Sequence, residues 1–385
     1  MRPGFQTLAL ALSAFTFSCQ EIKQPSFLSA ILGSSSSTVG VVTTDFGSSG
    51  RFTVINQEGF LLPGGSAIHS DAVARYQDGL VYVINRLNRD NIQILNPSLG
   101  FLTLAEFSTG AGSNPHDFWK VSESKAYVTL FNRTNLLIVN PSLGIASGGI
   151  DLSSLADTFS TSGIPDGLPE MDSMYLEGNS LYVTLERLDR NDASGRLPPN
   201  NPSYLVEINI VTDTVAGVYT FQSRNPFSKL RRVILNGQPH LVVACPSRLG
   251  FISALDGGVE AFNLVTKTFR PGFLYAETTA GGDILDVEIK NDTTGYAVVL
   301  DAAFNKFVHR FDPSTGQLIS VIAAFPTSAG TVAGLLLTPE GKLFAGDAGF
   351  SNPGVVIYDT NRGDTKLYPQ PINVGLRPFD FIYIP

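Results

Sequence analysis

The chain has 385 residues, of which 43% are apolar and 16% are charged, and its formal net charge is −8. This length is sufficient for a large core, and the charged share lies below the roughly 25% that is usual in soluble domains. Recognition of nucleic-acid phosphates needs clustered Lys and Arg. The negative net charge therefore argues against a nucleic-acid-binding protein. The nearest thing to a basic cluster, Lys229 with Arg231 and Arg232, is interpreted as a solvated strand edge.

The first 19 residues resemble a bacterial lipoprotein signal peptide. Arg2 supplies a minimal positive region, and the apolar stretch 8–17 is too short to span a bilayer. A small residue followed by Cys19 resembles a lipobox, although Thr16 stands where Leu is usual. The resemblance implies that Cys19 is lipidated and becomes the first residue of the mature protein. An ordinary secretory signal that is cut nearby remains the alternative.

Residues 20–37 predict a flexible tether, because the run Ser34–Ser37 has the composition of a linker. We therefore expect a protein of the bacterial cell envelope that is extracytoplasmic and attached to a membrane by a lipid. Gln20 replaces the Asp that, in the sorting pattern this segment resembles, favours the inner membrane, which points to the outer membrane. Cys245 lies in an apolar strand and is expected to be a buried, unpaired thiol.

From residue 38 onward, the sequence predicts short β-strands joined by tight turns. The motif Asn96–Gly100 (NPSLG) returns as Asn140–Gly144, 44 residues later (140 − 96). Each copy follows an apolar strand, and each of those follows a strand that contains Tyr-Val. A period of roughly 40–50 residues with several strands per unit is typical of propeller blades.

Seven segments can serve as the first strand of a blade. Five open with an acid, and the other two begin near Leu230 or Arg231 and at Gly334; the five acids are Asp71, Asp117, Asp172, Asp286 and Asp380. At the amino end, Thr38–Thr44, Arg51–Asn56 and Gly59–Leu62 form a unit that lacks a first strand, and Arg377–Phe381 can supply it. The prediction is an all-β, seven-bladed β-propeller over residues 38–385 whose C-terminal strand closes the N-terminal blade.

Two motifs carry a resemblance to a known family. Tyr82-Val83-Ile84-Asn85 and Asn114-Pro115-His116-Asp117 resemble the repeats of the YVTN-type, surface-layer-like β-propellers. The resemblance implies the propeller fold and an extracytoplasmic setting. It implies little about activity, because the fold hosts enzymes, binding proteins and scaffolds.

In a propeller, the acids that open the first strands gather at one rim of the central channel. Such a rim can bind a divalent cation, since Ca²⁺ prefers six to eight oxygen ligands. The other interpretation is that each acid accepts hydrogen bonds from backbone amides and joins one blade to the next. A position that repeats in several blades favours the structural interpretation.

The residues just before these acids differ between blades and are better candidates for a specific site. His69, His116 and Glu170 could form a two-histidine, one-carboxylate metal site or an acid–base pair. The alternative is that both histidines simply hydrogen-bond within loops. The predicted binding rim therefore consists of His69, Asp71, His116, Asp117, Glu170 and Asp172. The metal is unknown, and one divalent cation is the candidate cofactor.

Two long insertions, 151–170 and 187–202, exceed what a blade needs. Trp119, the sole tryptophan, is expected to pack between blades. No nucleophile elbow or phosphate-binding Gly loop is present in the sequence. We therefore expect a tethered binding or scaffold module whose partner is a protein or a small molecule. The alternative is a metal-dependent, lactonase-like hydrolase that uses the Asp and His residues of the rim.

Overall fold

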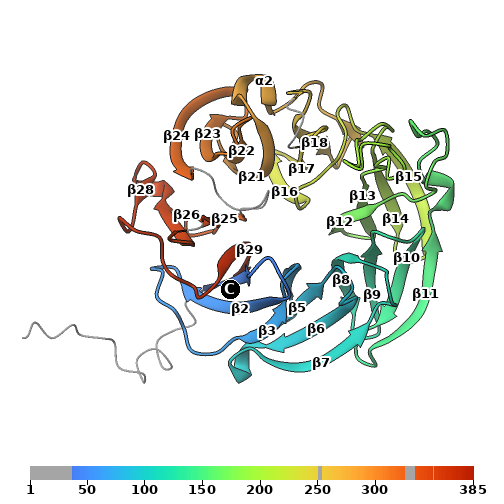
Figure 1. Cartoon of the computed structure of the whole chain (residues 1–385), viewed down its shortest axis with the longest axis horizontal. Helices are drawn as coiled ribbons and strands as arrows, with labels where there is room; N and C mark the ends of the chain where they lie inside the picture. Colours follow the sequence, from blue (N-terminus) through green and yellow to red (C-terminus); the bar gives the residue numbers. More distant parts are fainter. Residues whose placement is uncertain (1–36, 250–253, 326–333, 350) are drawn as a thin grey trace, which may run out of the picture. The chain divides into compact units, whose positions relative to one another are not determined.

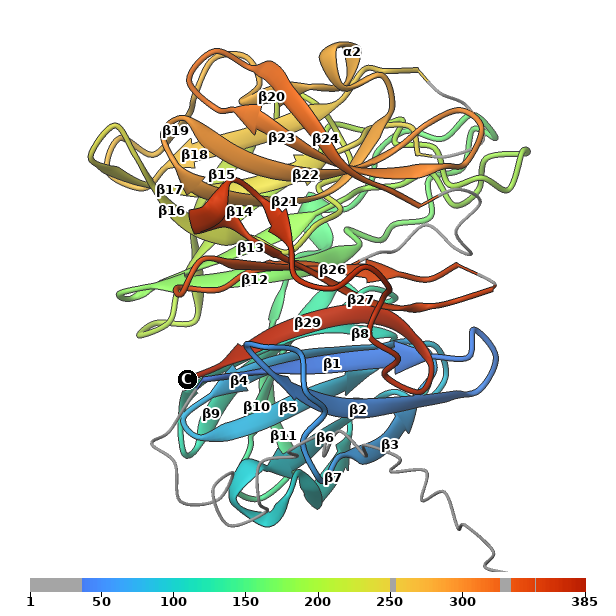
Figure 2. The same cartoon turned by 90° about the vertical axis from the view of Figure 1, so that its left-hand side faces the viewer.

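Seven small antiparallel sheets follow one another around a central channel in the computed structural model (Figures 1 and 2). The structure describes residues 37–249, 254–325, 334–349 and 351–385. The proposed signal peptide, Cys19 and the tether as far as residue 36 lie outside the described residues. Within them, no helix is both long enough and apolar enough to cross a membrane.

Each sheet is one blade of the propeller. Blade 1 contains β29 (Arg377–Ile384), β1 (Thr38–Thr44), β2 (Ser49–Asn56) and β3 (Ser66–His69). Blade 2 contains β4 (Ala72–Gln77), β5 (Leu80–Asn85), β6 (Asn91–Asn96) and β7 (Leu102–Ser108). Blade 3 contains β8 (Pro115–Ser122), β9 (Lys125–Leu130), β10 (Asn135–Asn140) and β11 (Ile145–Asp151). Blade 4 contains β12 (Met171–Glu177), β13 (Ser180–Leu185), β14 (Tyr204–Asn209) and β15 (Thr214–Thr220).

The second half of the ring repeats this arrangement. Blade 5 contains β16 (Arg231–Leu235), β17 (Gln238–Cys245), β18 (Gly258–Asn263), β19 (Thr268–Phe269) and β20 (Tyr275–Ala276). Blade 6 contains β21 (Asp283–Asn291), β22 (Thr294–Leu300), β23 (Lys306–Asp312) and β24 (Gln317–Phe325). Blade 7 contains β25 (Leu335–Leu337), β26 (Lys342–Asp347), β27 (Gly354–Asp359) and β28 (Thr365–Lys366). The short helices are η1 (Pro97–Leu99), η2 (Ser153–Leu155), α2 (Glu277–Ala280) and η3 (Thr360–Arg362).

The C-terminal strand closes the ring. β29 pairs antiparallel with β1, from Thr38 opposite Ile384 to Thr44 opposite Arg377. β29 is therefore the innermost strand of a blade whose other strands come from the amino end of the described chain (Figure 1). Without it, β1 would expose unpaired N–H and C=O groups along its edge. The predicted seven-bladed propeller with this closure is confirmed.

One predicted strand of blade 1 is wrong. Residues 59–62 follow a turn at 57–58 and make only a single bridge, between Ile55 and Leu61, and the outer strand is β3 instead. Pro63 has no N–H to donate to a sheet, and Gly64 and Gly65 adopt φ values of 109° and 113°. The strand can begin only after this break, so His69 ends an outer strand.

The core lies between neighbouring sheets, and the aromatic residues of the repeats form much of it. Tyr82 of blade 2 stacks on Phe118 of blade 3 with ring centroids 4.4 Å apart. Trp119 of blade 3 meets Tyr175 of blade 4 edge to face at 5.2 Å, which confirms its expected packing between blades. Cys245 is free and fully buried, as the sequence predicted.

Candidate functional site

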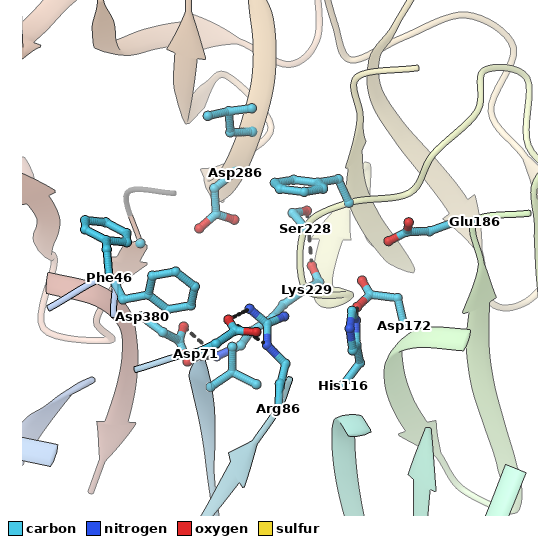
Figure 3. A pocket seen from close by; sticks show the side chains of 15 residues that line it. Phe46, Asp71, Arg86, His116, Asp172, Glu186, Ser228, Lys229, Asp286 and Asp380 are labelled. Atoms are coloured by element: carbon cyan, nitrogen blue, oxygen red, sulfur yellow. Dashed lines mark hydrogen bonds and ion pairs between the residues drawn. The ribbon is translucent and has the colours of Figure 1, made fainter. Parts of the chain in front are cut away.

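A cavity of about 440 Å³ opens at the end of the central channel where the first strands begin (Figure 3). Its volume lies within the range of roughly 300–1,000 Å³ that is usual for small-molecule sites. The predicted rim residues Asp71, His116 and Asp172 line the cavity, whereas His69, Asp117 and Glu170 do not. The other lining residues are Phe46, Val73, Arg86, Glu186, Phe227, Ser228, Lys229, Leu285, Asp286, Gly334, Phe379 and Asp380.

In three blades, an acid within the first strand joins the blade to the next one. Asp117 Oδ2 accepts a hydrogen bond from the amide of Met174 in the following blade, at 2.7 Å. Asp286 Oδ2 accepts from the amide of Leu335 at 3.1 Å, and Asp380 Oδ2 accepts from an amide of β4 at 3.0 Å. We call this the blade-locking position. The structural interpretation of the repeated acids is confirmed for these three residues.

In blade 4, the blade-locking position belongs to Ser173 and not to Asp172. Ser173 Oγ accepts a hydrogen bond from the amide of Leu230 at 2.9 Å. β8 and β12 both bulge near their start, but β8 has a second irregularity between Lys120 and Ser122 that β12 lacks. Asp117 and Asp172 both lie nine residues before the start of the next apolar run, at Ala126 and Leu181, so the sequence spacing aligns them, whereas the structure shifts the two blades by one residue. Asp172 occupies the position in β12 that His116 occupies in β8, and both residues line the cavity.

Two basic residues near the start of blade 5 pair with acids of other blades, Lys229 across the channel with blade 1 and Arg231 with the neighbouring blade 6. Lys229 Nζ lies 2.6 Å from Asp380, and Arg231 Nη1 lies 2.7 Å from Asp286. Their side chains are only 26% and 16% exposed, so the interpretation as a solvated strand edge is wrong for both. A blade-to-blade pairing that spans the channel leaves no local trace in the sequence. Arg232 does lie partly exposed, beside a Glu of β12.

His116 and Asp172 form a hydrogen-bonded pair in the cavity wall. Asn114 Oδ1 accepts from the amide of Leu87, so Asn114 Nδ2 is the donor to His116 Nε2, at 3.2 Å. The proton of the ring therefore resides on Nδ1, which donates to Asp172 Oδ1 at 2.7 Å. Burial lowers the pKa of His116, and the ring stacks on Phe131 at 4.1 Å. His116 is thus neutral at pH 7, and both of its nitrogens already have partners.

Glu186 is the most deeply buried carboxyl group of the cavity wall. It follows β13, is 5% exposed, and points its carboxyl group into the cavity beside Asp172 (Figure 3). Within the described part of the chain, no hydrogen bond or ion pair ends on this carboxyl group. Burial, and then the charge of Asp172, raise the pKa of Glu186 well above its usual value. Burial next to Asp172 thus disfavours the charged form of Glu186.

Glu186 and Arg86 were not among the predicted site residues, which all lie near the starts of the first strands. β5, β9 and β13 occupy the same place in three consecutive blades, and the residues that follow them are Arg86, Phe131 and Glu186. Arg86 Nε donates to Asp71 at 3.1 Å, while Phe131 supports the ring of His116. The residue that follows each Tyr-Val strand differs between these three blades. This difference is the signal in the sequence that could have identified Arg86 and Glu186 as site residues.

The structure gives His69 and Glu170 partners of their own. His69 Nδ1 accepts from the amide of Asp71 at 3.2 Å. Glu170 is fully buried, pairs with Arg190 at 2.7 Å, and has its pKa raised to about 8 by burial. Across residues 37–249, 254–325, 334–349 and 351–385, no group of three His, Cys, Asp or Glu residues is placed to hold a metal ion. His69, His116 and Glu170 are thus not brought together as one ligand set.

The two insertions pack on each other beside the cavity. Asp189, which is fully buried, accepts from Ser160 Oγ at 2.6 Å, and Arg187 Nη2 donates to the carbonyl of Ala156 at 2.7 Å. The first insertion leaves Phe159 and Ile164 exposed, at 54% and 69%. Neither 151–170 nor 187–202 contributes to the cavity wall.

No protein-family model and no curated protein matches the chain. Solved structures share its fold at low sequence identity. A putative 6-phosphogluconolactonase from Bacteroides uniformis is 16% identical, with a TM-score of 0.58 over 90% of this chain and 99% of that one. Dihydro-heme d1 dehydrogenase NirN is 12% identical, with a TM-score of 0.54 over 90% of this chain and 75% of that one. AztD from Citrobacter koseri is 10% identical, with a TM-score of 0.51 over 90% and 98%. These likenesses define the chain as a β-propeller and extend no further.

Proposed function

We propose that this chain is an exported, lipid-anchored β-propeller of the bacterial envelope that binds a small ligand in the cavity at the channel mouth. The observation that carries the proposal is the cavity wall itself. It combines five apolar side chains with nine polar or charged ones, and one of the latter, Glu186, is buried without a partner among the described residues. A concave site of this kind is the usual form of a ligand pocket.

The position of the first strand supports an anchored protein with an accessible cavity. β1 runs from Thr38 to Thr44, and Phe46, just beyond its end, lines the cavity. Thr38 pairs with Ile384 at the other end of the strand. A lipid upstream of Thr38 would therefore attach at the end of the blade away from the cavity. The outer membrane is the proposed location.

Two measurements test the two halves of this proposal. Labelled palmitate should enter the wild-type protein in the producing bacterium and should not enter the Cys19→Ser variant. Native mass spectrometry of the full-length protein, purified from the envelope fraction, should detect a bound small molecule that is lost on mild heating. Label in the Cys19→Ser variant would refute the anchor, and a protein that carries and accepts no ligand would refute the binding role.

The metal-dependent hydrolase is the second candidate, because five carboxyl groups and one imidazole line the cavity. Against it, neither nitrogen of His116 has a lone pair free for a metal or a substrate proton. Elemental analysis of residues 38–385 discriminates, with the double variant His69→Ala/His116→Ala as control. One equivalent of metal that is lost in the double variant would favour the hydrolase over the binding protein.

A further inference from the structure

The charges of the cavity wall do not balance. Of its five carboxyl groups, Asp71, Asp286 and Asp380 have an Arg or Lys partner. The remaining two, Asp172 and Glu186, have no cationic side chain bonded to them among the described residues. The wall therefore holds two acids that its own basic residues leave uncompensated.

The partner of Asp172 does not supply a positive charge. His116 is its hydrogen-bond donor, and the ring is neutral because burial lowers its pKa. Only Oδ1 of Asp172 is engaged by a side chain, so Oδ2 can accept a further hydrogen bond. Glu186 offers both of its oxygens. A carboxylate that is buried without a partner is costly, and a bound cation would remove that cost.

Another part of the wall is apolar. Phe46 lies across the cavity from Glu186 and Asp172 (Figure 3), and Phe227 and Phe379 also line it. Phe46 remains 42% exposed at the mouth, so a ligand would cover apolar surface there. A ligand that matches both parts has a charged head with N–H donors and an apolar body.

We propose that the cavity binds a small amphipathic amine, whose ammonium group lies between Glu186 and Asp172 and whose apolar part contacts Phe46. The inference rests on the proposed ligand-binding function and adds the chemical class of the ligand. An ammonium group fits because hydrogen bonds between N⁺–H and a carboxylate are short and strong. A divalent metal fits less well, since no three-residue ligand group surrounds the cavity within the described residues.

The experiment uses isothermal titration calorimetry on residues 37–385 with three probes of similar shape and different charge. The probes are 2-phenylethylamine, 2-phenylethanol and 3-phenylpropanoate. The amine should bind at least about tenfold more tightly than the alcohol, as expected for hydrogen bonds to charged groups. Glu186→Gln and Asp172→Asn should each weaken amine binding by about 10- to 100-fold and should leave alcohol binding unchanged.

Two controls separate recognition from folding. Glu186→Gln keeps the shape of the side chain and should retain the wild-type melting temperature. Glu106→Gln, which changes an exposed acid 38% accessible on blade 2, should bind the amine like the wild type.

Proton release on binding is a further measurement. It would not change if Glu186 had only a structural role. Binding in two buffers of different ionisation enthalpy should show a proton leaving Glu186, and affinity should rise as the pH rises toward the pKa of that group. The charged and titratable groups that face Glu186 are Asp172, Glu170, Arg190, Arg86 and the neutral His116.

The outcomes are distinct. Equal binding of amine and alcohol, or unchanged amine binding in Glu186→Gln, would overturn the amine proposal. Tight binding of the alcohol or the carboxylate alone would overturn it as well, while the cavity would remain a ligand site. Binding of no probe, together with no ligand in native mass spectrometry, would overturn both the amine proposal and the proposed function.

Discussion

Replacing Asp117 tests whether the blade-locking acids hold the ring together. Asp117 accepts hydrogen bonds from the amides of Phe118 and Met174, at 2.8 and 2.7 Å, and forms an ion pair with Arg75. Its side chain is 5% exposed and that of Arg75 is 14% exposed. In Asp117→Ala, the N–H of the fully buried Met174 loses its acceptor, and the guanidinium group of Arg75 loses its carboxylate partner and keeps only the carbonyl of Met174 as an acceptor, at 2.9 Å.

The expected loss follows from these contacts. Removing one partner of a buried ion pair costs about 3–5 kcal/mol. An orphaned buried N–H costs about 1–3 kcal/mol, and the two effects are not additive because they involve the same carboxylate. We expect Asp117→Ala to lower the free energy of unfolding by about 3–5 kcal/mol, a large share of the ~5–15 kcal/mol that stabilises a typical protein.

Equilibrium unfolding in urea measures this loss through the fluorescence of Trp119, the sole tryptophan, which packs against Tyr175 of the next blade. The matched control is Glu106→Ala, whose ion pair with Arg89 spans 3.3 Å and has side chains 38% and 56% exposed. An exposed pair of this kind contributes less than about 1 kcal/mol. If Asp117→Ala loses no more than the control, the blade-locking role of this acid is refuted.

Three other predictions concern stability and reactivity. Burial raises the pKa of Glu170 and Glu277 to about 8 and that of Glu288 to about 7, from 4.5 in the unfolded chain. The folded state therefore binds more protons in this window, and the free energy of unfolding should fall as the pH rises from about 4.5 to 8, by at most about 1.4 kcal/mol per pH unit for each group. Urea titrations that show a rise instead would contradict this sign. Deleting 377–385 opens the edge of β1, so size-exclusion chromatography should show aggregates, whereas deleting only the exposed Pro385 should leave a monomer; a native-like monomer from the longer deletion would count against closure by β29. Burial raises the pKa of the Cys245 thiol well above its usual value, so residues 37–385 should react with a thiol reagent at pH 8 only after urea is added, and rapid reaction of the folded chain would exclude the buried thiol.

The fold could be predicted from local patterns. Alternating apolar residues, the Tyr-Val strands and the repeated motif at Asn96 and Asn140 specify strands, turns and a period, and these depend on neighbours along the chain. The closure by β29 was also predictable, because a unit without its first strand lies at one end and a first strand without its unit lies at the other. Bulges were not predictable from these patterns, and the one-residue shift they cause exchanged the roles of Asp172 and Ser173.

The site was predictable only in part. Asp71, His116 and Asp172 line the cavity because the starts of the first strands converge on the channel, and this convergence follows from the repeat alone. Glu186 became a candidate only once its burial was known, since nothing local marks a glutamate after a strand as one without a partner. The pairing of Lys229 with Asp380 joins residues 151 positions apart. Local sequence patterns are thus sufficient to predict the propeller. The charge balance of the cavity is not predictable from them, because it depends on side chains that meet only when the ring closes.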